Sequence, residues 1–208
     1  MDFIFDPSLA FYLPLHELDG SSFRSRDAYG HLCTVTGATW GVQGRTFDGT
    51  DDKILVSSIT PPSGALSLFC WFKVLNSSSG ALLSLNSASA NQTMRIEATL
   101  EYKGSDNNSR RWAFDGRDGN WHCACFTTPG SAQADISSSV LMVDGVVKAV
   151  SSTTATGAPA ARNAFQIANE SSGSYFLKAI IGEVRMYSRV LTPQEIQYIY
   201  LATKWRYR

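Results

Sequence analysis

The sequence has no excess charge of either sign, because 18 lysines and arginines are matched by 18 aspartates and glutamates over 208 residues. A chain balanced in this way has no single-sign field with which to attract a nucleic acid backbone or an anionic membrane surface. Charged residues make up only 17% of the chain, whereas apolar residues reach 44% and aromatic residues 12%. This composition predicts a packed globular protein and argues against nucleic acid and membrane partners.

Long apolar runs are also absent. No segment approaches the roughly 18 apolar residues of a membrane span, and Met1-Asp2 opens a segment without the basic and apolar regions of a secretory signal. We therefore expect synthesis in the cytoplasm without an anchor, or association with a virion if the protein is viral. The nucleophile elbow Gly-x-Ser-x-Gly, the Walker loop and the His-Glu-x-x-His helix are missing as well.

Cysteine is scarce, with only Cys33, Cys70, Cys123 and Cys125. Cys123 and Cys125 lie in an extended run, where residues two apart share a face at about 6.7 Å. A disulfide needs Cβ atoms about 3.5 to 4.5 Å apart, so these two should not bridge each other. We expect four free, buried thiols, and no zinc site with His122, which points to the opposite face.

What the sequence has in abundance is short runs of β-branched, aromatic and alternating apolar residues, each closed by Gly, Asn, Asp or Ser. So many strands with so few helices must close as two packed sheets. We predict one all-β domain over residues 1–208, a two-sheet antiparallel sandwich. The expected strands are 9–15, 33–35, 45–47, 53–56, 65–74, 81–85, 94–101, 110–114, 122–126, 138–143, 146–150, 164–168 and 176–187.

Turn and helix signals complete this prediction. Asp144-Gly145 between two apolar runs indicates a two-residue type I′ hairpin. The polar stretch 151–157 indicates a loop. Thr192-Pro-Gln-Glu195 is a capping box that begins a short C-terminal helix from Pro193 to about Thr203. Ile196, Ile199 and Tyr200 follow at helical spacing and should face the sandwich.

Several segments, in this order and spacing, resemble the laminin-G-like, concanavalin A-like jelly roll over nearly the whole chain. They are Leu9-Ala-Phe-Tyr-Leu-Pro-Leu15, Thr36-Gly-Ala-Thr-Trp40, Gly44-Arg-Thr-Phe-Asp-Gly-Thr-Asp-Asp52, Ser67-Leu-Phe-Cys-Trp-Phe-Lys73, Asn120-Trp-His122, Val143-Asp-Gly145 and Gly182-Glu-Val-Arg-Met-Tyr-Ser-Arg-Val-Leu191. The resemblance implies a lectin-like or adhesive module that binds sugars or proteins, in some members with calcium. This implication is an analogy of fold.

Glycosidases on related sandwiches carry a strand motif Glu-x-Asp-x-x-Glu, which supplies the two carboxylates of the cleft. The nearest segment here, Glu17-Leu-Asp19-Gly-Ser-Ser22, lacks the last acid. We therefore expect no enzyme activity.

Calcium is a possible ligand of the acidic stretch that holds Asp48, Asp51 and Asp52, and Asp48 and Asp52 are the candidate ligands. The alternative is that Asp-Gly-Thr-Asp stabilises a tight turn without any metal. The family often adds a carboxylate just before the position of Glu183, where this chain has Gly182, and that departure counts against calcium.

A candidate ligand surface begins in the 94–101 run. Alternation places Arg95, Glu97 and Thr99 on one face, with Met94, Ile96 and Leu100 on the other. Trp112 follows after a polar loop. If Trp112 lies beside Arg95 and Glu97, its ring would stack on a sugar ring while the two charged side chains bond the sugar hydroxyls. The alternative is that Trp112 fills the core.

The last five residues combine three basic and two aromatic side chains. One interpretation is that Trp205, Arg206 and Tyr207 anchor another subunit or partner, because these residue types dominate interface hot spots. The other has Trp205 complete the packing of the helix while the arginines stay in water.

Three functional hypotheses remain. The first is a non-catalytic recognition module whose ligand is a carbohydrate. The second is a structural protein of a larger assembly, such as a virion decoration or fibre component, or a homo-oligomer. A glycoside hydrolase is disfavoured.

Overall fold

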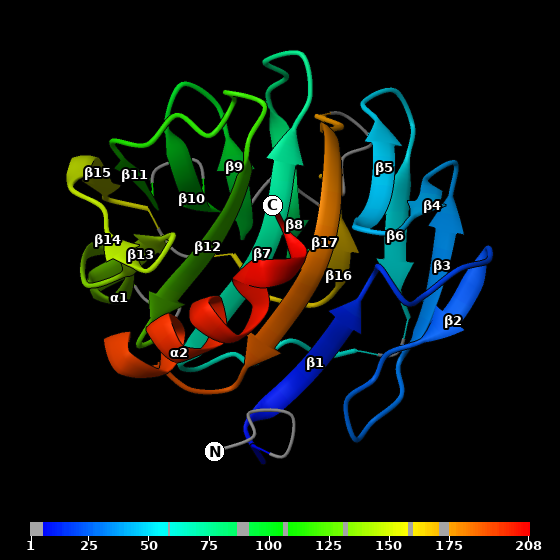
Figure 1. Ribbon diagram of the computed structural model, residues 1–208. Helices are drawn as coiled ribbons and strands as arrows, with labels where there is room; N and C mark the ends of the chain where they lie inside the picture. The colour runs from blue at the N-terminus through cyan, green and yellow to red at the C-terminus, as the bar shows by residue number, and fades with distance from the viewer. Residues whose placement is uncertain are drawn as a thin grey trace.

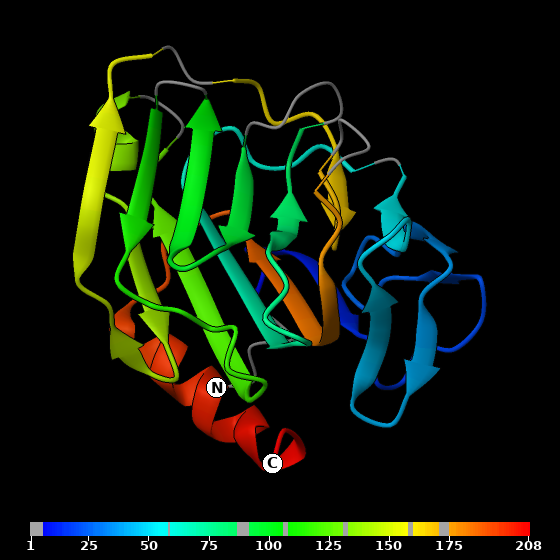
Figure 2. The same ribbon diagram turned by 90° about the horizontal axis from the view of Figure 1, so that it is seen from above.

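The computed structural model describes residues 6–57, 59–86, 92–105, 108–130, 133–157, 160–170 and 175–208, without the side chain of residue 133. Over these residues the strands form two antiparallel sheets, of eight and nine strands, that pack face to face (Figures 1 and 2). The all-β two-sheet sandwich predicted from the sequence is therefore confirmed. No helix within the described ranges has the length and apolar character needed to cross a membrane.

The eight-stranded sheet, called sheet A, is centred on the long strands β7 and β17. Its order is β14 (Val146–Val147), β13 (Val140–Val143), β12 (Trp121–Thr128), β7 (Leu66–Val74), β17 (Lys178–Tyr187), β5 (Gly44–Asp48) and β4 (Thr39–Gly41). The remaining strand, β1 (Leu9–Pro14), pairs with the second half of β17. The hairpin between β13 and β14 turns at Asp144 and Gly145 with φ of 55° and 78°, as the Asp-Gly signal predicts.

The nine-stranded sheet, called sheet B, contains the other strands of the described residues. Its order is β15 (Val150–Ala155), β11 (Asn108–Trp112), β10 (Leu100–Ser105), β9 (Thr93–Ile96), β8 (Gly80–Ser84), β16 (Phe165–Ile167), β6 (Lys53–Val56), β3 (Leu32–Thr36) and β2 (Ser22–Arg24). Strand β15 forms one edge of this sheet, as Figure 2 shows. A short helix, α1 (Gln133–Ser137), precedes β13 and contributes the fully buried Ile136.

Two apolar clusters hold the fold together. The larger lies between the sheets and includes Phe72, Tyr102, Trp112 and Phe126. Tyr102 stacks on Phe126 with ring centroids 4.0 Å apart. The smaller cluster lies on the other face of sheet A, under helix α2 (Pro193–Thr203), which crosses that face in Figure 1. The four cysteines are free and buried, as expected.

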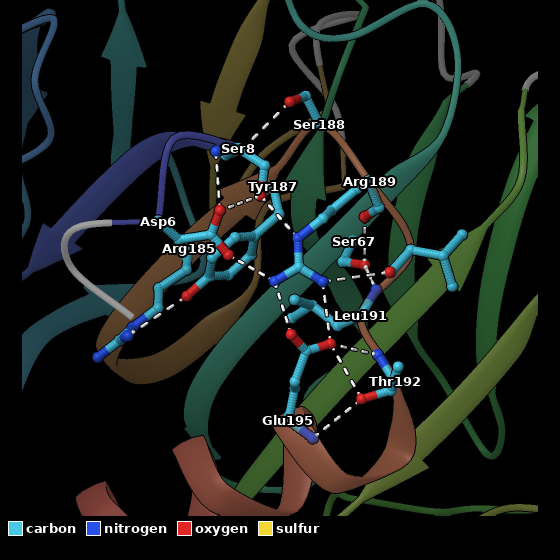
Figure 3. Close-up of polar contacts among 11 residues, drawn as sticks. Asp6, Ser8, Ser67, Arg185, Tyr187, Ser188, Arg189, Leu191, Thr192 and Glu195 are labelled. Atoms are coloured by element: carbon cyan, nitrogen blue, oxygen red, sulfur yellow. Dashed lines mark hydrogen bonds and ion pairs between the residues drawn. The ribbon is translucent and has the colours of Figure 1, made fainter. Parts of the chain in front are cut away.

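Helix α2 is fixed to the sandwich at its first turn (Figure 3). Thr192 and Glu195 form the predicted capping box. Arg189, in the turn after β17, donates to both Glu195 carboxylate oxygens at 2.8 and 2.9 Å, and also pairs with Asp6. Bidentate pairing of this kind is among the stronger charge-assisted contacts. Arg189 therefore joins the start of the helix to the segment that leads into β1.

Three local predictions are wrong. The run 94–101 is not one strand but the end of β9, a turn at residues 97–99 and the start of β10. The stretch 151–157, predicted as a loop, forms most of β15. Strands β2 and β4 and helix α1 were not predicted from the sequence. None of these differences changes the architecture.

Candidate functional site

A row of charged side chains crosses the outer face of sheet B. Arg95 on β9 is the register partner of Glu101 on β10, and Glu101 is the register partner of Arg111 on β11. Their neighbours Met94 and Tyr102 lie in the core, so these three side chains point away from it. Glu101 forms an ion pair with Arg111 at 3.2 Å, and its side chain is 4% exposed. The row therefore alternates in sign across three adjacent strands.

Two residues from the chain between β16 and β17 join this row. Glu170, 2% exposed, forms an ion pair with Arg95. Tyr175 lies with its ring centroid 5.0 Å from the Arg95 guanidinium carbon, and its hydroxyl donates to Glu97. The Tyr175 residue remains 36% exposed. We call the group Arg95, Glu97, Glu101, Arg111, Glu170 and Tyr175 the Tyr175 face.

Burial changes the acid–base properties of this face. It raises the pKa of the Glu170 carboxyl, an effect that the Arg95 guanidinium opposes and the Glu101 carboxylate reinforces. Burial and the hydrogen bond to Glu97 raise the pKa of Tyr175 to about 12. The Tyr175 hydroxyl therefore stays protonated at neutral pH and acts as a hydrogen-bond donor.

The structure places Trp112 in the core, which is the alternative that the sequence left open, and not on the ligand surface. Trp112 is 1% exposed, and its ring lies 5.9 Å from that of Phe126 in the core between the sheets. The reason is its register, because Trp112 pairs with Leu100, one step out of phase with Glu101 and Arg95. Trp112 therefore cannot stack a ligand beside Arg95. The aromatic ring on that surface is Tyr175.

Arg95 and Glu97 do not lie as neighbours on one strand. Glu97 lies in the turn between β9 and β10, where its backbone N–H donates to the Thr99 carbonyl at 2.9 Å. The Tyr175 side chain contacts both residues and so links them. Sequence reasoning missed Glu170 and Tyr175, which follow β16 in a polar segment. The backbone brings Tyr175 beside β9 through β8, because the Tyr175 carbonyl accepts from the Ala81 N–H at 3.0 Å and Ala81 is the register partner of Arg95.

The acidic loop after β5 places oxygen atoms of Asp48, Asp51 and Asp52 within 4.8 Å of one another. Asp48 accepts the Thr50 N–H at 2.7 Å, and Asp52 accepts the Asp48 N–H at 2.8 Å. Burial and the two neighbouring carboxylates raise the pKa of Asp52. Calcium takes six to eight oxygen ligands, so this donor set fits it only in part, and the observed hydrogen bonds are those of a tight turn.

Gly182 does not bear on that loop. It lies four residues along β17 from Lys178, the register partner of Asp48, which is about 13 Å at the rise of a strand. A Cβ at Gly182 would lie 2.2 Å from the Tyr207 ring, so the glycine leaves room for that side chain. Calcium at Asp48 and Asp52 stays a prediction.

The C-terminal residues divide differently from either reading of the sequence. Tyr207, 5% exposed, stacks on Trp71 with ring centroids 4.5 Å apart. Arg206 pairs with the buried Glu183 at 3.3 Å. Trp205 is 63% exposed. A 3-10 turn over Lys204–Arg206 directs Tyr207, rather than Trp205, onto the sheet. Tyr207 and Arg206 therefore pack within the domain, and only Trp205 remains available as an anchor.

Comparison with known proteins agrees with this architecture. A laminin G-type family model, described as the concanavalin A-like lectin/glucanases superfamily, matches residues 48–197. Trypanosoma rangeli sialidase in complex with 2,3-difluorosialic acid, a covalent intermediate, is similar with a TM-score of 0.71 and 16% identity, over 98% of this chain and 34% of that chain. The receptor binding domain of botulinum neurotoxin C/D mosaic serotype is similar with a TM-score of 0.69 and 11% identity, over 94% of this chain and 51% of that chain.

These similarities concern the fold only. At such identities they show the fold alone, and this chain spans about a third of the sialidase and about half of the toxin domain. No curated protein matches the sequence.

Proposed function

This chain belongs to the concanavalin A-like lectin/glucanase superfamily, and from that membership we propose that it is a non-catalytic recognition module that binds carbohydrate on the Tyr175 face. The observation that supports the proposal most directly is the Tyr175 ring, which is 36% exposed and contacts both Arg95 and Glu97. An aromatic ring presents an apolar surface to the C–H face of a sugar. The flanking guanidinium and carboxylates can donate to and accept from its hydroxyls.

The site is also pre-organised. The Tyr175 ring is held by the cation–π contact with Arg95, and Arg95 by its ion pair with Glu170. Side chains fixed before binding lose less conformational entropy when a ligand arrives. This arrangement favours a ligand that is recognised by stacking and several hydrogen bonds over one recognised by charge alone, because the row of charges alternates in sign.

The test is a glycan array followed by NMR titration of the best ligand. We expect Tyr175→Ala to weaken binding by about tenfold or more, because a central aromatic contact dominates most binding sites. Tyr198→Ala is the matched control, since Tyr198 is 50% exposed and lies on α2, on the other side of the sandwich. Equal binding by the wild type and Tyr175→Ala would refute the site.

The absence of catalysis is part of the proposal. Glu101 and Glu170 lie on the same face, but each is paired with an arginine. A hydrolase needs one carboxylic acid and one free carboxylate across a cleft. We expect no release of reducing sugar from a polysaccharide panel. Release above a heat-treated control that is lost in both Glu101→Gln and Glu170→Gln would show that the protein is an enzyme.

One observation favours the alternative of a structural protein in a larger assembly, such as a virion component. Tyr198 and Leu201 lie three residues apart on α2 and are each 50% exposed, and Trp205, in the 3-10 turn that follows α2, is 63% exposed, so these three side chains form an exposed apolar stripe at the end of the chain. Such a stripe is typical of a protein contact. Light scattering of the wild type and of Leu201→Ser/Trp205→Ser tests this alternative. A monomeric wild type over the micromolar range would exclude self-assembly through the stripe.

A further inference from the structure

His122, near the start of β12, has a carboxylate on each side of its ring. Its Nδ1 lies 2.8 Å from an oxygen of Asp144, in the turn between β13 and β14. Its Nε2 lies 3.1 Å from an oxygen of Asp118, in the loop between β11 and β12. The His122 side chain is only 13% exposed, and the Phe72 and Phe114 rings pack against it. One largely buried ring therefore joins this loop to the β13–β14 hairpin.

Both contacts are hydrogen bonds only when the His122 ring carries two protons. A neutral imidazole has one N–H donor and one acceptor nitrogen, and an acceptor that faces a carboxylate is repelled by it. Each carboxylate is also held by a second hydrogen bond, because Asp144 accepts from the Cys123 N–H and Asp118 from the Asn120 N–H, both at 2.8 Å. Loss of one ring proton therefore leaves a fixed carboxylate opposite a lone pair.

The loop between β11 and β12, residues 113–120, depends on side chains for its attachment. Within the described part of the chain, no backbone–backbone hydrogen bond reaches residues 115–120. Arg117 donates to the Ser79 hydroxyl at 3.1 Å, but this bond is exposed to solvent. The contact of Asp118 with His122, by contrast, is made to a largely buried partner. We therefore expect the His122 contact to matter most for the position of the loop.

The same loop covers part of the core and borders the Tyr175 face. A Cβ at Gly116 would lie 3.2 Å from the Phe72 ring, so the loop backbone rests directly on that ring. The hydrogen bond to Asp115 and, in smaller part, the charge of Glu97 raise the pKa of Arg117, so the loop lies near the Glu97 carboxylate. An opened loop would uncover apolar surface and remove a positive charge from the edge of the Tyr175 face.

We propose that His122 is a pH-operated latch, which in its doubly protonated form holds the loop 113–120 closed over Phe72 and releases it when the ring loses a proton. The latch stands on the contacts of His122 with its two carboxylates. Neither the latch nor its test depends on carbohydrate binding, so a failure of one proposal leaves the other unchanged.

The two carboxylates are the charges that set the direction of this switch. Burial lowers the pKa of His122, but the hydrogen bonds and negative charges of Asp144 and Asp118 outweigh it and raise that pKa above its ordinary value of 6.5. In the opened loop the ring would titrate near the ordinary value. The closed form therefore has its full advantage below about pH 6.5 and loses it as the pH rises through the raised pKa.

Other charged residues near His122 are directed elsewhere. Lys148, which follows β14, lies over the Phe114 ring with its Nζ 5.2 Å from the ring centroid. Asp115 and Arg117, in the loop itself, pair with each other at 2.8 Å. Strand β7 contributes only an aromatic ring to the surroundings of His122. The switch should therefore follow the titration of His122 and of no other group.

The experiment is an NMR measurement at pH 5.5 and 8.5 of Cα–H order parameters for residues 115–120, together with a titration of the His122 ring. In the wild type we expect values near 0.85, typical of rigid backbone, at pH 5.5 and a fall toward 0.6 or below at pH 8.5. The midpoint of this fall should coincide with the titration of His122. His122→Gln and Asp118→Asn should each make the order parameters independent of pH. His31→Gln, in the turn between β2 and β3, is the matched control and should behave like the wild type.

Three results would overturn the latch. They are wild-type order parameters that are equal at the two pH values, a pH effect that persists in both His122→Gln and Asp118→Asn, and a His122 titration at or below pH 6.5. Melting temperatures at pH 5.5 show whether each variant is folded. If His122→Gln does not fold, Asp118→Asn decides the question, because it changes a side chain that is 45% exposed.

Discussion

The two aromatic residues of the C-terminal segment should differ sharply in what they contribute to stability. Tyr207 is 5% exposed and packs against two indoles, Trp71 at 4.5 Å and Trp121 at 4.8 Å between ring centroids. Burial of a large apolar side chain contributes about 1.5 to 3 kcal/mol, and each aromatic pair adds about 0.5 to 1.5 kcal/mol. Because the site lies near the chain end and can partly collapse, we expect Tyr207→Ala to lower the free energy of unfolding by about 3 kcal/mol.

The assay is thermal and denaturant unfolding followed by circular dichroism. For a domain of this size, 3 kcal/mol corresponds to a fall of roughly 6 to 12 °C in melting temperature. Tyr207→Phe keeps the ring and should stay within about 1 kcal/mol of the wild type. Trp205→Ala removes a larger ring that is 63% exposed and should change stability by about 0.5 kcal/mol or less. If Trp205→Ala is the more damaging of the two alanine variants, the packing described here is wrong.

Three further predictions concern acid stability, the thiols and calcium. The hydrogen bonds from Arg189 lower the pKa of Glu195 to about 2, so its stabilising contribution is present above pH 4.5 and lost as the pH falls toward 2. The stability difference between the wild type and Glu195→Gln should therefore be constant near neutrality and shrink below about pH 5 in acid titrations of the melting temperature. Burial raises the pKa of each cysteine thiol, so a thiol reagent should find four groups after denaturation without reductant and almost none before, and fewer than four would reveal a disulfide. If Asp48 and Asp52 bind calcium, millimolar calcium should raise the melting temperature relative to a chelator and Asp48→Asn should abolish the rise, whereas an unchanged melting temperature would mean that the acidic loop binds no calcium.

The features that the sequence predicted well depend on contacts between near neighbours in the chain. The capping box at Thr192 and Glu195 and the type I′ turn at Asp144 are each encoded within four residues. The run 94–101 was wrongly predicted as one strand because its alternation of apolar and polar residues continues through a turn that holds no glycine or proline. Strand β15 was not predicted because it lies at the edge of sheet B with its side chains in solvent, so its sequence shows no alternation of apolar residues.

The candidate site could be predicted only in part, because it depends on how distant strands are paired. Alternation places Arg95 and Met94 on opposite faces, and the structure agrees. Whether Trp112 shares the face of Arg95 depends on the registers of β10 against β9 and β11, and a shift of one residue reverses the answer. Tyr175 lies 80 positions from Arg95, and no local pattern relates the two.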